Sequence, residues 1–201
     1  YRPVTLKTYS NDTRLRTWGT FVRTTSVNKG VARVTATSDV LGIAKKKKAY
    51  VKQTIIAPDG KRFEKTTECG PTGQSLACFD IQQPHLWSVE KPTLYRLVTE
   101  VFVDGKLCDT QTERFGIRTV EVTPEGGFML NGKTIALKGV CLHHDLGPIG
   151  AAVNRAALTR QIMTLKDMGC NAIRTAHNMP STMQMELCDS LGMMVMAESF
   201  D

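Results

Sequence analysis

The chain has 201 residues, of which 41% are hydrophobic and 22% charged, a composition typical of globular proteins. Its net charge is +7 at pH 7, but the densest basic run, 45–48, lacks the interleaved aromatic residues of nucleic-acid-binding domains. We expect this run to be a solvated turn between strands. No run of about 18 apolar residues predicts a transmembrane helix, and no N-terminal apolar segment predicts a signal peptide.

The six cysteines are scattered without a C-x-x-C pair, so the sequence predicts neither a zinc ribbon nor a thioredoxin-like site. Cys69 and Cys78 bracket a turn and would form a disulfide only in an oxidising compartment; we expect both to be free.

Residues 12–118 have the pattern of short strands separated by turns. Val, Thr, Tyr and Phe, often alternating with polar residues, predict strands over 17–25, 31–37, 50–56, 93–103 and 111–118. Glycine or proline marks the turns between them, as in Asp104-Gly105. Since no helical window interrupts these strands, we predict an immunoglobulin-like β-sandwich.

After residue 118 the hydrophobic period changes. We predict strands over 134–140, 171–176 and 193–198, with a helix capped by Asn154 between the first two and a helix over 181–191 between the last two. This β-α-β-α-β pattern is typical of a parallel sheet with helical crossovers. Right-handed crossovers would place the three strands side by side in chain order.

Polar side chains follow each of these three strands, and the carboxyl ends of parallel strands are where βα folds place their chemistry. The candidates are His143, His144, Asp145, Arg174, His177, Asn178, Glu198 and Asp201. Packing of Arg174 and His177 within a barrel wall is one alternative to a functional site. A zinc site built on the histidines is another, although the His-His-Asp spacing fits no common zinc pattern.

The order of motifs resembles glycoside hydrolase family 2, the group of β-galactosidases, β-glucuronidases and β-mannosidases. The resemblance rests on Asn171-x-x-Arg174-x-x-His177-x-x-Pro180, on Trp87, Pro92, Leu94 and Tyr95, and on Phe115-Gly116-Ile117-Arg118. It implies a multidomain β plus α/β protein. Residues 1–11 would be the last strand of a jelly-roll sugar-binding domain, 12–118 the Ig-like β-sandwich, and 119–201 the N-terminal part of a truncated (β/α)8 TIM barrel.

The resemblance also implies roles for the polar residues. His143 would contact the sugar in the −1 subsite, His177 would donate to sugar hydroxyls, and Arg174 would hold the nucleophilic carboxylate ionised and oriented. Glu198 would orient substrate or neighbouring side chains, and Asp145 and Asn178 complete the substrate-binding or supporting set. The string CLHHD stands where many members of the family have NRHEH or a similar string and agrees with it only at His143, so the resemblance does not carry a role over to His144 and carries that of Asp145 less directly.

A retaining glycosidase needs two carboxylates about 5–5.5 Å apart. In the family, one is a glutamate that follows an asparagine after the fourth barrel strand, and the other follows the seventh. This sequence has no Asn-Glu dipeptide and ends at the third predicted strand. We therefore expect an inactive fragment of a retaining exo-β-glycosidase that hydrolyses terminal β-D-sugar residues, with β-galactosidase favoured over β-glucuronidase and β-mannosidase. The alternative is a non-catalytic carbohydrate-binding or structural module.

The expected partner is a β-galactoside, with no nucleic acid and no membrane. No cofactor is required by the residues present, although a divalent cation is compatible with a full-length family enzyme. Three strands of an open barrel leave an unpaired edge, so we expect self-association into a homo-oligomer. A periplasmic or secreted location is slightly favoured over a cytoplasmic one.

Overall fold

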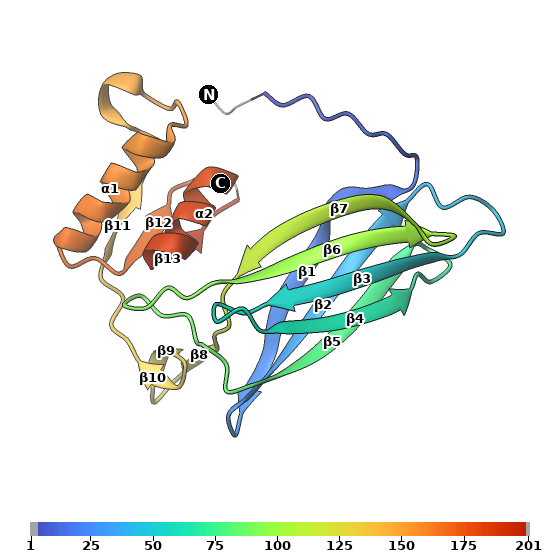
Figure 1. The fold of residues 1–201 in the computed structure, drawn as a ribbon. Helices are drawn as coiled ribbons and strands as arrows, with labels where there is room; N and C mark the ends of the chain where they lie inside the picture. The colour runs from blue at the N-terminus through green and yellow to red at the C-terminus, as the bar shows by residue number, and fades with distance from the viewer. Residues whose placement is uncertain (1–3, 200–201) are drawn as a thin grey trace. The chain divides into compact units, whose positions relative to one another are not determined.

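The structure is a computed structural model that describes residues 4–199 (Figure 1). The chain divides into two compact units, which we describe separately. The sandwich unit comprises Lys7–His85 and Thr93–Thr119. The barrel unit comprises mainly Leu86–Pro92 and the residues from Val120 onwards. No helix in the described part of the chain is long and apolar enough to cross a membrane.

Two antiparallel sheets form the sandwich unit, with strand orders β1-β2-β5 and β4-β3-β6-β7 (Figure 1). The strands are β1 (Arg14–Asn28), β2 (Val31–Leu41), β3 (Ala49–Ile56), β4 (Arg62–Glu68), β5 (Gln74–Gln82), β6 (Tyr95–Val103) and β7 (Lys106–Phe115). No helix occurs within 18–116, a span that the structure describes throughout. The predicted Ig-like sandwich is confirmed.

Alternation of apolar and polar residues explains the sandwich core. In β5, every second residue is buried, including Phe79 and Ile81. A polar pair also lies in this interior, where the fully buried Gln53 donates from Nε2 to Ser38 Oγ at 3.0 Å. Strands β4 and β5 were not predicted. The RFEKTTE sequence of β4 is charged, and its residues are mostly exposed at the sheet edge.

The segment expected to be a jelly-roll strand is only partly described. Residues 4–11 form no strand, and residues 1–3 lie outside the described part of the chain. A β-strand needs a neighbour to satisfy its backbone N–H and C=O groups. The assignment of 1–11 to a preceding domain therefore stays a prediction.

The barrel unit begins with a small antiparallel sheet and continues as a parallel one. The antiparallel sheet contains β8 (Val120–Thr123), β9 (Gly127–Leu130) and β10 (Lys133–Thr134). The elements that follow are β11 (Gly139–Leu142), the 3-10 helix η1 (Gly147–Ile149), α1 (Arg155–Asp167), β12 (Ala172–Thr175), α2 (Thr182–Leu191) and β13 (Met194–Ala197). Strands β11, β12 and β13 pair in parallel and in chain order, as predicted.

The predicted strand over 134–140 is wrong. Thr134 pairs with Met129 across the hairpin of β9 and β10, and Ile135 N donates to Phe128 O. The first parallel strand begins only at Gly139, where a Cβ atom would collide with the carbonyl oxygen of Ala172. The apolar run therefore contains the end of a hairpin and the start of a barrel strand, and periodicity alone does not separate the two.

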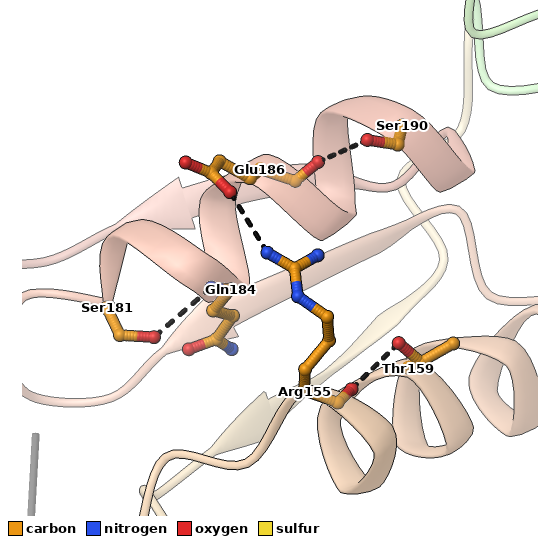
Figure 2. A network of polar contacts seen from close by, with 6 residues as sticks. All are labelled: Arg155, Thr159, Ser181, Gln184, Glu186 and Ser190. Carbon is orange, nitrogen blue, oxygen red and sulfur yellow. Dashed lines mark hydrogen bonds and ion pairs between the residues drawn. The ribbon is translucent and has the colours of Figure 1, made fainter. Parts of the chain in front are cut away.

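Helix caps and apolar packing hold the β-α-β-α-β unit together. The side chains of Asn154 and Ser181 accept hydrogen bonds from backbone N–H groups at the starts of α1 and α2. Arg155 on α1 forms an ion pair with Glu186 on α2 at 3.3 Å (Figure 2). Beneath these contacts lies an apolar core formed by Leu158, Ile162, Leu165, Ile173, Leu187, Cys188 and Met193.

A short segment from the middle of the sequence belongs to this unit. Within Leu86–Pro92, Trp87 is only 1% exposed, and its indole Nε1 donates to Asp189 O at 2.7 Å. The Lys166 ammonium group donates to the carbonyl oxygens of Val89, Leu191 and Gly192. Lys166 thereby satisfies the C-terminal carbonyls of α2 and fixes the 86–92 segment beside them.

Candidate functional site

Five side chains gather at the carboxyl ends of the three parallel strands, and we call them the rim cluster. They are Cys141 on β11, His143 just after it, Arg174 on β12, His177 just after it, and Glu198 just after β13. The parallel register, which sets Cys141 opposite Arg174, places these residues at adjacent positions along one edge. The structure thus brings together four residues that the sequence predicted, together with Cys141.

Arg174 and Glu198 form the central contact of the rim cluster. Nε and Nη2 of Arg174 each lie 2.7 Å from the same oxygen, Oε1 of Glu198. Nη1 makes a longer contact of 3.5 Å with the sulfur of Cys141. The hydrogen bonds to Cys141 and Glu198 raise the pKa of the Arg174 guanidinium above its ordinary value, so its charge is permanent.

The second oxygen of Glu198 faces an imidazole. Nδ1 of His177 lies 3.6 Å from Oε2 of Glu198, and the His177 side chain is 47% exposed. The ring of His143 meets that of His177 edge to face, with 5.6 Å between centroids. One carboxylate therefore contacts a guanidinium through one oxygen and faces an imidazole with the other.

Asp145 and Asn178 have no recorded contact with the rim cluster. Oδ1 of Asp145 accepts a hydrogen bond from Gly147 N at 2.8 Å and so shapes the loop after β11. Both residues line a separate cavity of about 460 Å³, which we call the loop pocket. Asp201, the last candidate from the sequence, lies outside the described residues.

Two residues near the site were missed or left without a role by the sequence reasoning. Asn171 accepts a hydrogen bond from Lys138 N through Oδ1 and donates to Ala136 O through Nδ2, which fixes the chain leading into β11. Its place as the first residue of the motif containing Arg174 was the available signal. Cys141 gave no such signal, because a thiol in an apolar strand resembles ordinary core.

The rim cluster suits binding of a hydroxylated ligand. Its imidazoles, guanidinium and carboxylate offer both hydrogen-bond donors and acceptors. Glu198 is its one carboxylate, whereas retaining glycoside hydrolysis needs two. Among residues 4–199, no three His, Cys, Asp or Glu side chains lie close enough together to hold a metal ion. The five rim residues therefore offer hydrogen-bond donors, acceptors and one carboxylate at a single edge of the sheet.

Comparison with known families gives two adjoining matches. The profile described as "Glycosyl hydrolases family 2" matches residues 11–118, and the profile of the "Glycosyl hydrolases family 2, TIM barrel domain" matches residues 120–200. The division between them falls where the β-sandwich gives way to β8.

Curated proteins and solved structures agree with these matches. The chain is 38% identical over 190 residues to "Beta-galactosidase BoGH2A" of Bacteroides ovatus, covering 92% of this chain and 22% of that protein. It is 36% identical over 201 residues to a "Putative beta-glucuronidase" of Formosa agariphila, covering 100% of this chain and 19% of that protein. A solved β-glycosidase from Bacteroides vulgatus superposes with a TM-score of 0.86 at 38% identity, over 94% of this chain and 24% of that one. The chain thus spans about a fifth of the length of these curated relatives.

Proposed function

Because this chain belongs to glycosyl hydrolase family 2, we propose that it supplies part of the sugar-binding rim of a retaining exo-β-glycosidase, with terminal β-D-galactosides as substrates. The observation that carries this proposal is the rim cluster, in which Arg174, His177 and Glu198 meet at the ends of adjacent parallel strands. In a (β/α)8 barrel this edge is the catalytic face.

Each rim residue has a distinct role in this proposal. Arg174 uses two nitrogens on Glu198, which leaves Nη1, now in a weak contact with Cys141, to reach the nucleophilic carboxylate. A guanidinium there would keep that carboxylate ionised and aimed at the anomeric carbon. His143 and His177, which lie edge to face, would bind sugar hydroxyls. The acid/base and nucleophile themselves are not among the rim residues.

Charge favours a neutral sugar over a glucuronide. Arg174 is the one permanent cation of the rim cluster, and Glu198 occupies two of its nitrogens. A glucuronide carboxylate brought to this edge would face Glu198 without an uncommitted cation among the five rim residues to balance it. A galactoside carries only hydroxyls and encounters no such repulsion.

The test is a substrate panel with the protein that contains this chain and a complete barrel. We expect turnover of p-nitrophenyl β-D-galactoside to exceed that of the corresponding glucuronide and mannoside. Turnover of the glucuronide alone would overturn the assigned sugar. An absence of turnover for all three, with sugar binding retained, would favour a non-catalytic carbohydrate-binding module.

A further inference from the structure

The outer face of the three-stranded sheet β1-β2-β5 carries a row of exposed apolar side chains (Figure 1). Phe21 on β1 pairs with Thr37 on β2, which pairs in turn with Leu76 on β5, so the three side chains lie side by side on one face. The alternate residues of β2 and β5 are buried in the sandwich core. Phe21 is nevertheless 61% exposed and Leu76 is 56% exposed, because both project from the face opposite the core.

A bulge in β1 adds a third large side chain beside this row. The register shifts between Leu15 and Thr20, so that residues 16–19 stand opposite Asp39 alone. Trp18, within the bulge, is 78% exposed and has a φ of 61°, a backbone conformation that is rare for an aromatic residue. Strained conformations of this kind cluster at binding sites. We call Trp18, Phe21 and Leu76 the sheet patch.

The size of the sheet patch suits the centre of a protein interface. Its three side chains expose about 400 Å² of surface, judged from the 150–250 Å² that one aromatic side chain can bury. Contiguous apolar patches of this size on a monomer commonly mark interaction sites. A stable interface buries about 800 Å² on each partner, with an apolar centre and a polar rim. The residues around the patch would therefore form the rim.

Unlike charges flank the sheet patch on its two sides. On one side, Arg23 lies two residues beyond Phe21 and is exposed, and its side chain has no ion-pair or hydrogen-bond partner among the described residues. On the other side, Asp39 lies two residues beyond Thr37 and meets Arg16 in a longer, exposed contact of 3.5 Å. The patch thus has an uncommitted cation on one side and a weakly held carboxylate on the other.

This pattern is self-complementary about a two-fold axis that runs along the apolar row. When two copies meet face to face about such an axis, the side that carries Arg23 lies opposite the side of the other copy that carries Asp39 and Trp18. The guanidinium of Arg23 can then bind the partner's Asp39 or stack on the partner's Trp18, while the two apolar rows pack together. We propose that the sheet patch is a dimer interface whose occupant is a second copy of this chain.

The test is sedimentation velocity of the protein that contains this chain and a complete barrel, because a closed barrel has no open strand edge to offer as another contact surface. We expect a monomer–dimer equilibrium with a micromolar Kd. Phe21→Glu places two carboxylates at the centre of the interface and should weaken dimerisation about tenfold or more. Leu107→Glu is the matched control, since Leu107 is 52% exposed on β7 in the other sheet, and it should leave the Kd unchanged. Thermal melts confirm that both variants are folded.

Charge reversal identifies the second copy as the occupant. Arg23→Glu sets a carboxylate against the partner's Asp39, and Asp39→Arg sets a second cation against the partner's Arg23, so each variant alone should dimerise about tenfold more weakly. An equimolar mixture of the two variants should recover the original Kd within about threefold, because both contacts of the mixed dimer join opposite charges. The proposal is overturned by a protein that stays monomeric at about 100 µM. It is equally overturned if Phe21→Glu leaves the dimer intact, or if the mixture associates no better than its components.

Discussion

Arg174 contacts Glu198 through a single carboxylate oxygen, because Nε and Nη2 of Arg174 both lie 2.7 Å from Oε1 of Glu198. The other oxygen, Oε2, is left facing His177 at 3.6 Å. Glu198 therefore couples the orientation of a guanidinium to that of an imidazole on the same strand end. We propose that Glu198 is a positioning residue, whose replacement would act through Arg174 and His177.

Replacement of Glu198 tests that coupling. In the protein with a complete barrel, we expect Glu198→Gln to lower kcat/KM for a β-galactoside about tenfold or more, because the neutral amide no longer holds the Arg174 guanidinium by charge. Glu186→Gln is the matched control, since it removes an ion pair with Arg155 away from the rim. Equal effects of the two substitutions would show that Glu198 has no special role.

Lys166 offers a test of how the 86–92 segment is held. Lys166→Met keeps the aliphatic stem but leaves the carbonyls of Val89, Leu191 and Gly192 without their donor. We expect the free energy of unfolding to fall by about 1–3 kcal/mol, measured by urea denaturation. Lys133→Met, at an exposed position on β10, is the control and should change the free energy of unfolding little. A Lys166→Met protein as stable as the wild type would contradict the assigned role.

Two helix-terminal glycines separate backbone strain from steric collision. Gly169 and Gly192 both have positive φ, at 88° and 75°, but only at Gly192 would a Cβ atom meet a neighbour, the carbonyl oxygen of Val89. Gly169→Ala should destabilise by about 1–2 kcal/mol, the cost of a left-handed residue. Gly192→Ala should lower the free energy of unfolding by clearly more, measured by the same urea denaturation. Similar costs for both would mean that Val89 moves aside freely.

Cys188 gives the stability a pH dependence. Burial raises the pKa of its thiol to about 12, above the value in an unfolded chain, so the folded state favours the neutral form. The contribution of this pKa shift to the free energy of unfolding is complete below the pKa of the thiol in the unfolded chain. It is lost as the pH rises from about 9 towards 12. We expect unfolding free energies between about pH 7 and pH 10.5 to fall more steeply for the wild type than for Cys188→Ala. Parallel pH profiles for the two proteins would refute this.

Local patterns predicted the parts of the fold that depend on neighbours in sequence. Asn154 caps α1 and Gly192 ends α2, as the sequence predicts, through hydrogen bonds that any isolated helix would make, whereas Ser181, predicted to lie inside the second helix, is its N-cap. The boundary at Gly139 was not predictable in this way, because it depends on contact with Ala172, 33 residues later.

In the candidate site, too, some features follow from neighbours in sequence and others from contacts between distant residues. The motif containing Arg174 and His177 located the rim cluster, since strand ends of a parallel sheet converge. The partition of Asp145 and Asn178 into a separate pocket, which Gln184 also lines, depends on how loops and helices pack in three dimensions. Gln184 in particular follows a Ser-x-x-Gln pattern that is typical of a capping box, in which its side chain would bond back to the N-cap. No such bond is recorded in the structure.

Steady-state kinetics of Arg174→Ala test most directly whether Arg174 supports the nucleophile of a retaining β-galactosidase, as we propose. In the protein with a complete barrel, we predict that kcat for p-nitrophenyl β-D-galactoside falls about 100-fold or more while KM changes little, because the guanidinium acts on the attacking group and most ground-state sugar contacts survive. Arg174→Lys should not restore kcat, since an ammonium cannot make the planar fork. A thermal melt confirms folding of each variant. An Arg174→Ala protein with a raised KM and an unchanged kcat would contradict the account.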